Sequence, residues 1–151
     1  MKNKTIFKTL LALAVILGAS SFTFQSNLNT LKVKVTGIRS ADGDVHVLIF
    51  NKATGFPMND EMAYRHVKCK AAKGEVAIDM ANIPSGKYAI VSFHDFDGNN
   101  RFDKSWFGSP KEDYGFSNIP NEFCGTPSFQ QTCFEVSATN SSVSVNLMHI
   151  K

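Results

Sequence analysis

The chain has 151 residues, of which 43% are hydrophobic, 16 are Lys or Arg and 13 are Asp or Glu. This length is sufficient for a domain with its own hydrophobic core. The Lys and Arg residues do not gather into the basic patch that phosphate contacts need, so a nucleic-acid partner is not expected.

The first 21 residues have the three-part pattern of a secretory signal peptide. Three lysines lie within the first eight residues, residues 10–19 form an apolar run, and Ala19-Ser20-Ser21 supplies a small-residue cleavage region. The apolar run is shorter than the roughly 20 residues that a membrane-spanning helix needs. We therefore predict export to the periplasm or out of the cell, with no membrane-spanning segment left in the mature protein. Because the signal carries three basic residues and no acidic one, the mature chain has 13 of each.

Residues 28–151 are predicted to form one β domain. In LKVKVTGI, Leu31, Val33 and Val35 fall on one face, and this period of two is typical of a half-buried strand. Similar runs cover residues 31–38, 44–51, 74–80, 86–95, 132–138 and 142–150, with a weaker run at 64–71. About seven short strands predict an all-β, antiparallel sandwich of the immunoglobulin-like type with one long loop.

Turn residues separate these runs. Asp42-Gly43 is a strong signal for a hairpin between the first two runs. Thr139-Asn140-Ser141 predicts another hairpin between the last two. The one helical candidate is Pro57–Arg65, where a turn or two of helix is expected.

The long loop begins with DFDGNNRFD, which is the candidate cation site. Asp95, Asp97, Asn99 and Asp103 place side-chain oxygens at relative positions 1, 3, 5 and 9, and Arg101 offers a backbone carbonyl at position 7. Calcium takes six to eight oxygen ligands at flexible distances, and this spacing is how an acidic loop supplies them. The sequence therefore predicts a weak calcium site at Asp95–Asp103.

The loop is not an EF-hand, and a metal-free reading is also open. Position 6 is Asn100 in place of glycine, although Asn tolerates the left-handed conformation, and position 12 is Trp106 in place of glutamate. Glu112 or Asp113 is then the candidate for a distant closing ligand. Alternatively, Asp, Asn and Gly form a hydrogen-bonded turn without any ion.

The second half of the loop is aromatic. Trp106, Phe107, Tyr114 and Phe116 occur together with Gly108, Pro110 and Gly115. A long ordered loop needs packing of its own, so these rings are expected to fold back and cap one end of the sandwich. The alternative is an exposed platform that binds an envelope glycan, a peptide or another protein.

The three cysteines are Cys69, Cys124 and Cys133. Export permits a disulfide, and the segment between Cys124 and Cys133 contains Gly125 and Pro127, so it can turn back on itself. We predict a Cys124–Cys133 bridge. Cys69 alternates with Val67 and is expected to face the core as a free thiol. Three reduced thiols remain the alternative, because sequence alone does not fix pairing.

Catalytic motifs are scarce in this chain. It has no G-x-S-x-G elbow and no H-E-x-x-H zinc motif. The four histidines are scattered, and His94 beside Asp95 is the one candidate for a hydrolase pair. A hydrogen-bonded structural histidine is the expected outcome. The sequence thus favours an exported, non-enzymatic module.

Four segments in order carry a family resemblance: VTGIRSADGDVHVLIFN, GFP, IPSGKYAIVSFHDFDGNNRFD and WFGSPKEDYGFSN. From about Leu31 to the C-terminus, the chain resembles bacterial secreted proteins grouped as domain of unknown function 2141. That name implies no established activity. The start of the IPSGKYAI strand is also similar to transthyretin-like and carboxypeptidase-regulatory modules, which implies a β-sandwich and no particular chemistry.

Overall fold

A computed structural model describes residues 28–106, 108–120, 123 and 125–150. The predicted signal peptide and Cys124 lie outside these residues. The strands are β1 (Leu28–Ile38), β2 (Asp44–Phe50), β3 (Arg65–Lys70), β4 (Gly74–Pro84), β5 (Gly86–Asp95), β6 (Tyr114–Phe116), β7 (Phe134–Val136) and β8 (Ser142–Asn146). Two short helical turns accompany them, the 3-10 turn η1 (Asp60–Met62) and α1 (Phe129–Thr132).

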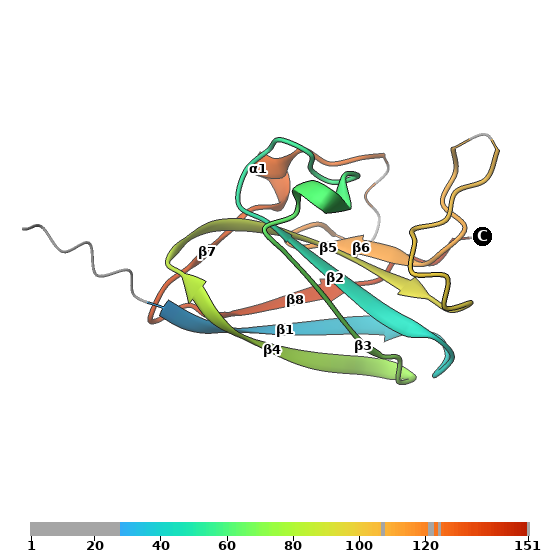
Figure 1. Cartoon of the computed structure of the whole chain (residues 1–151), viewed down its shortest axis with the longest axis horizontal. Helices are drawn as coiled ribbons and strands as arrows, with labels where there is room; N and C mark the ends of the chain where they lie inside the picture. Colours follow the sequence, from blue (N-terminus) through green and yellow to red (C-terminus); the bar gives the residue numbers. More distant parts are fainter. Residues whose placement is uncertain (1–27, 107, 121–122, 124, 151) are drawn as a thin grey trace, which may run out of the picture.

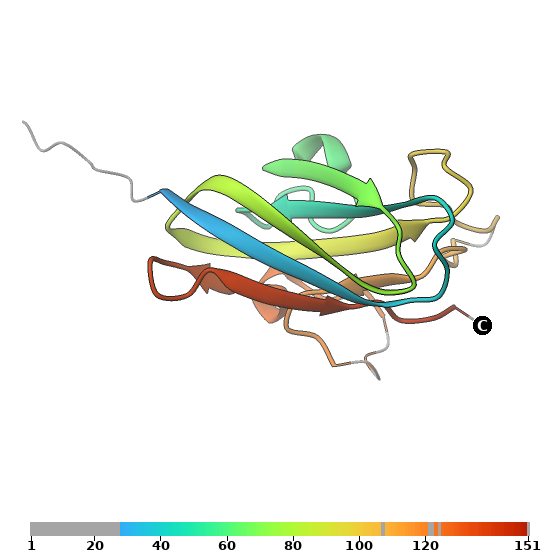
Figure 2. The same cartoon turned by 90° about the horizontal axis from the view of Figure 1, so that it is seen from below.

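The strands form two sheets that face each other (Figure 1). One sheet has the order β4-β1-β8, and the other has the order β3-β2-β5-β6, with β7 also pairing with β5. All pairs are antiparallel except β1 with β8, which is parallel. The view from below looks onto the β4-β1-β8 sheet, with the other sheet behind it (Figure 2). The main apolar core lies between the two sheets. The predicted all-β sandwich is confirmed.

The alternating side chains of the larger sheet serve two different apolar clusters. In β2, Val45, Val47 and Ile49 point into the core between the sheets, whereas Leu48 and Phe50 belong to a second cluster on the outer face. All seven residues of β2 are therefore buried. A strand covered on both faces is apolar in nearly every position, which explains why this run lacks a clean alternation.

Loops cover that outer face. The segment between β2 and β3 brings Phe56 and Ala63 onto it, the loop after β5 brings Phe102, and α1 brings Phe129. In Figure 1, α1 and the segment between β2 and β3 lie above the five-stranded sheet, and the loop after β5 rises at its right-hand end. The outer face of β2, β5 and β6 is thus a partly enclosed surface, and the candidate site lies at one end of it.

Both predicted hairpins are wrong, because the strands that they join belong to different sheets. β1 pairs with β4 and β8, whereas β2 pairs with β3 and β5, so Asp42-Gly43 lies in a crossover between the layers. The turn at Thr139-Asn140-Ser141 likewise joins β7 of one sheet to β8 of the other. A tight turn determines chain direction, but the partner strand depends on which faces must be buried.

One of the two helical turns was expected. The turn or two of helix expected at Pro57–Arg65 is the single 3-10 turn Asp60–Met62. The sequence patterns did not predict α1. Ser128 caps α1 by accepting a hydrogen bond from the Gln131 amide, while the Gln131 side chain accepts one from the Ser128 amide. This reciprocal arrangement is a capping box, which was the overlooked signal.

The two described cysteines, Cys69 and Cys133, form no disulfide with any described residue. Cys69 packs against the core between the sheets, as its alternation with Val67 indicates, and burial raises the pKa of its thiol. Cys133 Sγ lies 3.4 Å from the backbone oxygen of Gln130. Since Cys124 lies outside the described residues, its pairing with Cys133 is not seen and stays a prediction. Among the described residues, no helix is long and apolar enough to cross a membrane.

Candidate metal centre

The candidate site begins at Asp95, the last residue of β5. Its side chain is fully buried and folds the following residues around itself. Asp95 Oδ1 accepts hydrogen bonds from the amides of Gly98 at 2.8 Å and Asn99 at 3.1 Å, and Oδ2 accepts one from Asn100 at 2.8 Å. Burial disfavours the charged carboxylate, but these donors and a contact with Asp97 outweigh it and hold the pKa of Asp95 below its usual value.

Asn100 provides the sharp bend in this loop. Its φ angle is 63°, in the left-handed region that the sequence analysis anticipated at this position. Its side chain also accepts a hydrogen bond from Lys68 Nζ at 2.5 Å, which ties the loop to β3. The turn is thus held by two hydrogen bonds of Asn100, one from its amide to Asp95 and one from Lys68 to its side chain.

Glu112 reaches the same point from the other end of the loop. Phe93 pairs with Tyr114, and the Asp113 oxygen accepts a hydrogen bond from the His94 amide at 2.9 Å. The same antiparallel register, continued by one step, places Glu112 across from Asp95 on the outer face. Oxygens of Asp95, Asp97 and Glu112 all lie within 4.8 Å of one another.

The environment of Glu112 is unfavourable for a charged carboxylate. The residue is 1% exposed, its Oε2 accepts a hydrogen bond from the Asp103 amide at 3.0 Å, and its Oε1 has no partner among the described residues. Burial raises the pKa of Glu112 to about 7. The Asp103 amide lowers it, while the charges of Asp95, Asp103 and Asp97 raise it further.

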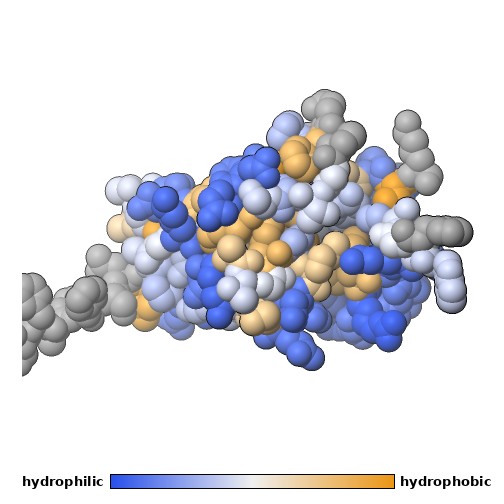
Figure 3. Space-filling view, turned by 90° about the horizontal axis from the view of Figure 1, so that it is seen from above, coloured by the Kyte–Doolittle hydropathy of each residue, from blue (hydrophilic) through white to orange (hydrophobic). Residues whose placement is uncertain are grey.

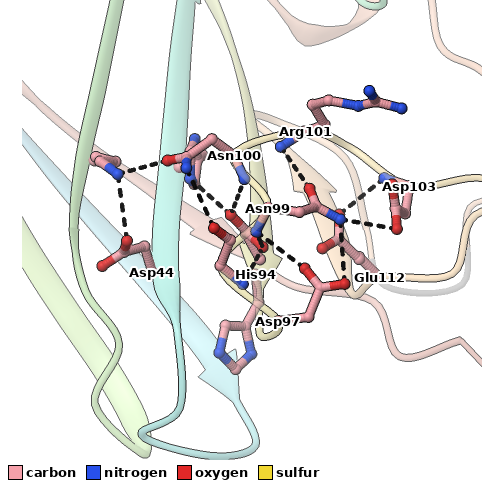
Figure 4. A network of polar contacts seen from close by, with 12 residues as sticks. Asp44, His94, Asp97, Asn99, Asn100, Arg101, Asp103 and Glu112 are labelled. Atoms are coloured by element: carbon pink, nitrogen blue, oxygen red, sulfur yellow. Dashed lines mark hydrogen bonds and ion pairs between the residues drawn. The ribbon is translucent and has the colours of Figure 1, made fainter.

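Asn99 and Asp103 lie beside this cluster (Figure 4). The Asn99 side-chain amide donates to Asp97 Oδ2 at 3.1 Å and to Asp103 Oδ2 at 3.0 Å, and its own oxygen accepts from the Arg101 amide at 2.8 Å. Asn99 therefore bridges two carboxylates by donating hydrogen bonds. The Arg101 side chain points away from the cluster in Figure 4. Of the five predicted ligands, the structure brings Asp95 and Asp97 together with Glu112.

Asp113, the other candidate for a closing ligand, points to the opposite face and has a structural role. It accepts a bidentate pair from Arg39, with Nε at 2.6 Å and Nη2 at 2.7 Å. His149 Nδ1 and the Ile150 amide, both at 3.1 Å, complete its contacts. This carboxylate ties the start of β6 to the segment after β1 and to the end of the chain.

Two histidines that looked isolated in the sequence meet beside Asp95. His46 Nδ1 lies 2.8 Å from His66 Nε2, and His46 Nε2 lies 3.4 Å from Asp95 Oδ2. Burial lowers the pKa of both imidazoles. The register of β2 against β3 pairs His46 with Lys68 and Leu48 with His66, so the two rings are diagonal neighbours. The sequence alone does not reveal the contact between the two rings, because the contact depends on the register of β2 against β3.

The structure does not bring together the residues of the other two predicted sites, the hydrolase pair and the aromatic platform. His94 is buried, its Nε2 lies 2.7 Å from the Asp42 oxygen, and as a strand neighbour of Asp95 it points to the opposite face. Trp106 is 96% exposed, whereas Tyr114 and Phe116 lie in β6 and pack with each other at 5.7 Å between ring centroids. Phe107 lies outside the described residues. The described rings of the predicted platform therefore do not share one surface.

Three carboxylates that converge from two segments are suited to a hard divalent cation. Calcium accepts carboxylates and water in irregular arrangements, whereas magnesium demands near-ideal octahedral geometry.

Comparison with known proteins adds one match. A family model described as "Uncharacterized protein conserved in bacteria (DUF2141)" matches residues 33–144, which include all three carboxylates. No curated protein and no solved structure matches the chain.

Proposed function

Because the chain belongs to the DUF2141 family, an uncharacterised family conserved in bacteria, we propose a function from the site itself: the protein is an exported, non-enzymatic β-sandwich module that a calcium ion stabilises. Asp95, Asp97 and Glu112 would supply the protein ligands. The signal-peptide pattern of the first 21 residues supports export. His94 and Asp95 point to opposite faces of the sheet, which argues against a hydrolase pair at these two residues.

The observation that carries the proposal is the unpaired Oε1 of Glu112. A buried oxygen without a donor is costly, and native proteins rarely leave one. Here the second oxygen is already paired and two further carboxylates lie nearby, so a hydrogen bond from a neutral neighbour would not relieve the repulsion. A divalent cation would satisfy the oxygen and offset the three negative charges together.

The test is thermal unfolding of the exported protein in chelator and in millimolar calcium. Intact mass of the purified protein establishes whether the signal has been removed. If calcium binds only the folded state, an ion at about 100 times its dissociation constant adds about 2.7 kcal/mol and raises the midpoint by several degrees.

Matched variants locate the site. Glu112→Gln keeps the shape of the side chain but removes its charge, so it should abolish most of the calcium-dependent rise. Glu61→Gln removes the same charge from an exposed residue of η1 and should leave the rise intact. Equal midpoints of the wild-type protein in chelator and calcium would refute the proposal.

A further inference from the structure

A cavity of about 240 Å³ lies on the outer face of the five-stranded sheet, next to the candidate metal centre. It lies between the segment that joins β2 to β3 and the loop that follows β5. Leu48, Val91 and Phe116 form its floor, because they occupy one row of the sheet: Leu48 pairs with Val91, and Val91 pairs with Phe116. The space-filling view of this side shows apolar surface in the middle and polar residues around it (Figure 3).

The walls of the cavity are aromatic. Phe93 and Tyr114 extend the floor, and Phe102 leans over them from the loop. The ring centroids of Phe102 lie 5.3 Å from Phe93 and 5.6 Å from Tyr114. The Phe102 and Tyr114 rings meet edge to face, whereas the planes of Phe102 and Phe93 are tilted by 59°. Aromatic pairs of this kind favour a further ring beside them. The cavity is smaller than the roughly 300–1,000 Å³ of sites for drug-sized ligands, so it suits a molecule with a single ring.

Two cations without acidic partners line the same cavity. The Arg101 guanidinium makes no hydrogen bond or ion pair with any described residue. Lys104 Nζ lies 3.4 Å from Met58 Sδ across the cavity and 5.9 Å from the Phe102 ring centroid. Asp60 is the one acidic residue among those that line the cavity, and its Oδ1 accepts a hydrogen bond from the Glu61 amide.

We propose that this cavity binds a small molecule made of one aromatic ring and a carboxylate. The ring would lie on Leu48 and Val91 against the aromatic wall, and the carboxylate would pair with Arg101 and Lys104 at the rim. Arg is suited to this role because its planar guanidinium can bind a carboxylate through two parallel hydrogen bonds. The proposal does not rest on the calcium site, since neither cationic side chain is one of its ligands.

Phenylacetate and its neutral analogue phenylacetamide test the proposal directly. The two have nearly the same shape and differ in charge, so titration calorimetry of the exported protein separates the contribution of the cations. We expect phenylacetate to bind with a millimolar or lower dissociation constant and phenylacetamide to bind at least five-fold more weakly. Chemical shifts of a ¹⁵N-labelled sample should change most at the amides of Leu48, Val91 and Phe102.

Replacing the cations provides the decisive comparison. The double variant Arg101→Gln, Lys104→Gln should bind the two ligands equally, whereas Lys73→Gln, Lys87→Gln, which removes the same charge from exposed residues away from the cavity, should keep the preference. Both results are expected in calcium and in chelator. Absence of saturable phenylacetate binding, equal binding of the two ligands by the wild-type protein, or an unchanged preference in the first double variant would each overturn the proposal.

Discussion

The folded protein disfavours the charged form of the Glu112 carboxyl group. Its pKa of about 7 lies above the ordinary value of 4.5, with burial as the largest cause. Below pH 4.5 the group is neutral in both folded and unfolded chains and costs nothing. As the pH rises toward 7 and beyond, the unfolded chain loses this proton first, so the free energy of unfolding falls.

This predicts a specific pH dependence in chelator. Relative to wild type, Glu112→Gln should become more stable as the pH rises from 4.5 to about 8, by at most roughly 3 kcal/mol, because each pKa unit corresponds to about 1.4 kcal/mol. Urea unfolding of both proteins at several pH values measures the difference. His46 and His66, with lowered pKa values, act in the opposite direction. They are present in both proteins, so their contribution cancels.

Calcium provides the control for this residue. A bound cation stabilises the charged form of Glu112, so the advantage of Glu112→Gln at high pH should disappear or reverse in millimolar calcium. A difference between the two proteins that stays constant from pH 4.5 to 8 in chelator would contradict the raised pKa.

At the scale of elements, the short strand β6 joins the two sheets. Gly115 lies where β6 approaches β8, and Tyr114 exchanges backbone hydrogen bonds with Met148 at 3.3 and 2.7 Å. A Cβ atom at Gly115 would lie 2.1 Å from the Asn146 oxygen and 3.1 Å from Val145 Cγ1. Only glycine permits this approach, because the nearest atom belongs to the backbone and cannot rotate away.

Gly115→Ala should therefore destabilise the protein by about 1–3 kcal/mol or more, the usual range for overpacking. Urea unfolding measures the change. Ser144→Ala, at an exposed position of β8, is the matched control and should stay within about 0.5 kcal/mol of wild type. If Gly115→Ala were as stable as this control, β6 would not be held close to β8.

The strands could be predicted from sequence, but the sheets could not. Period two identifies β1, β2, β4, β5 and β8 because each alternates or is apolar throughout. Strand β6 could not be predicted from the sequence, because its three residues follow a long loop and are too few for a pattern. The turn signals also suggested hairpins between strands of different sheets, since turn chemistry is local and sheet assignment depends on burial of distant faces.

Only part of the candidate site could be predicted from the sequence, because the other part depends on how distant strands pair. Asp95 and Asp97 are close in sequence, and the turn that they form follows from local chemistry. Glu112 and Asp113 were equal candidates until the register of β6 was known. Counting in steps of two from Tyr114 then places Glu112 on the outer face with Asp95 and sends Asp113 to the other face.

At the scale of the whole molecule, one loop serves both the candidate metal centre and the cavity. Asp97 and Glu112 lie on either side of the segment that carries Arg101, Phe102 and Lys104. A cation would hold both ends of this segment. The wall of the cavity would then be ordered before a ligand arrives, and a ligand that finds an ordered wall loses less conformational entropy on binding.

We therefore predict that calcium strengthens binding in the cavity. The dissociation constant of phenylacetate, measured by titration calorimetry, should be about five-fold lower in saturating calcium than in chelator, a coupling of about 1 kcal/mol. Because coupling between two sites is reciprocal, saturating phenylacetate should lower the dissociation constant of calcium by the same factor. Glu112→Gln should bind phenylacetate with the chelator value in both buffers, since its site no longer holds the ion. If the wild-type protein binds phenylacetate equally in both buffers while calcium still raises its melting midpoint, the two sites are independent and the loop is already ordered without the ion.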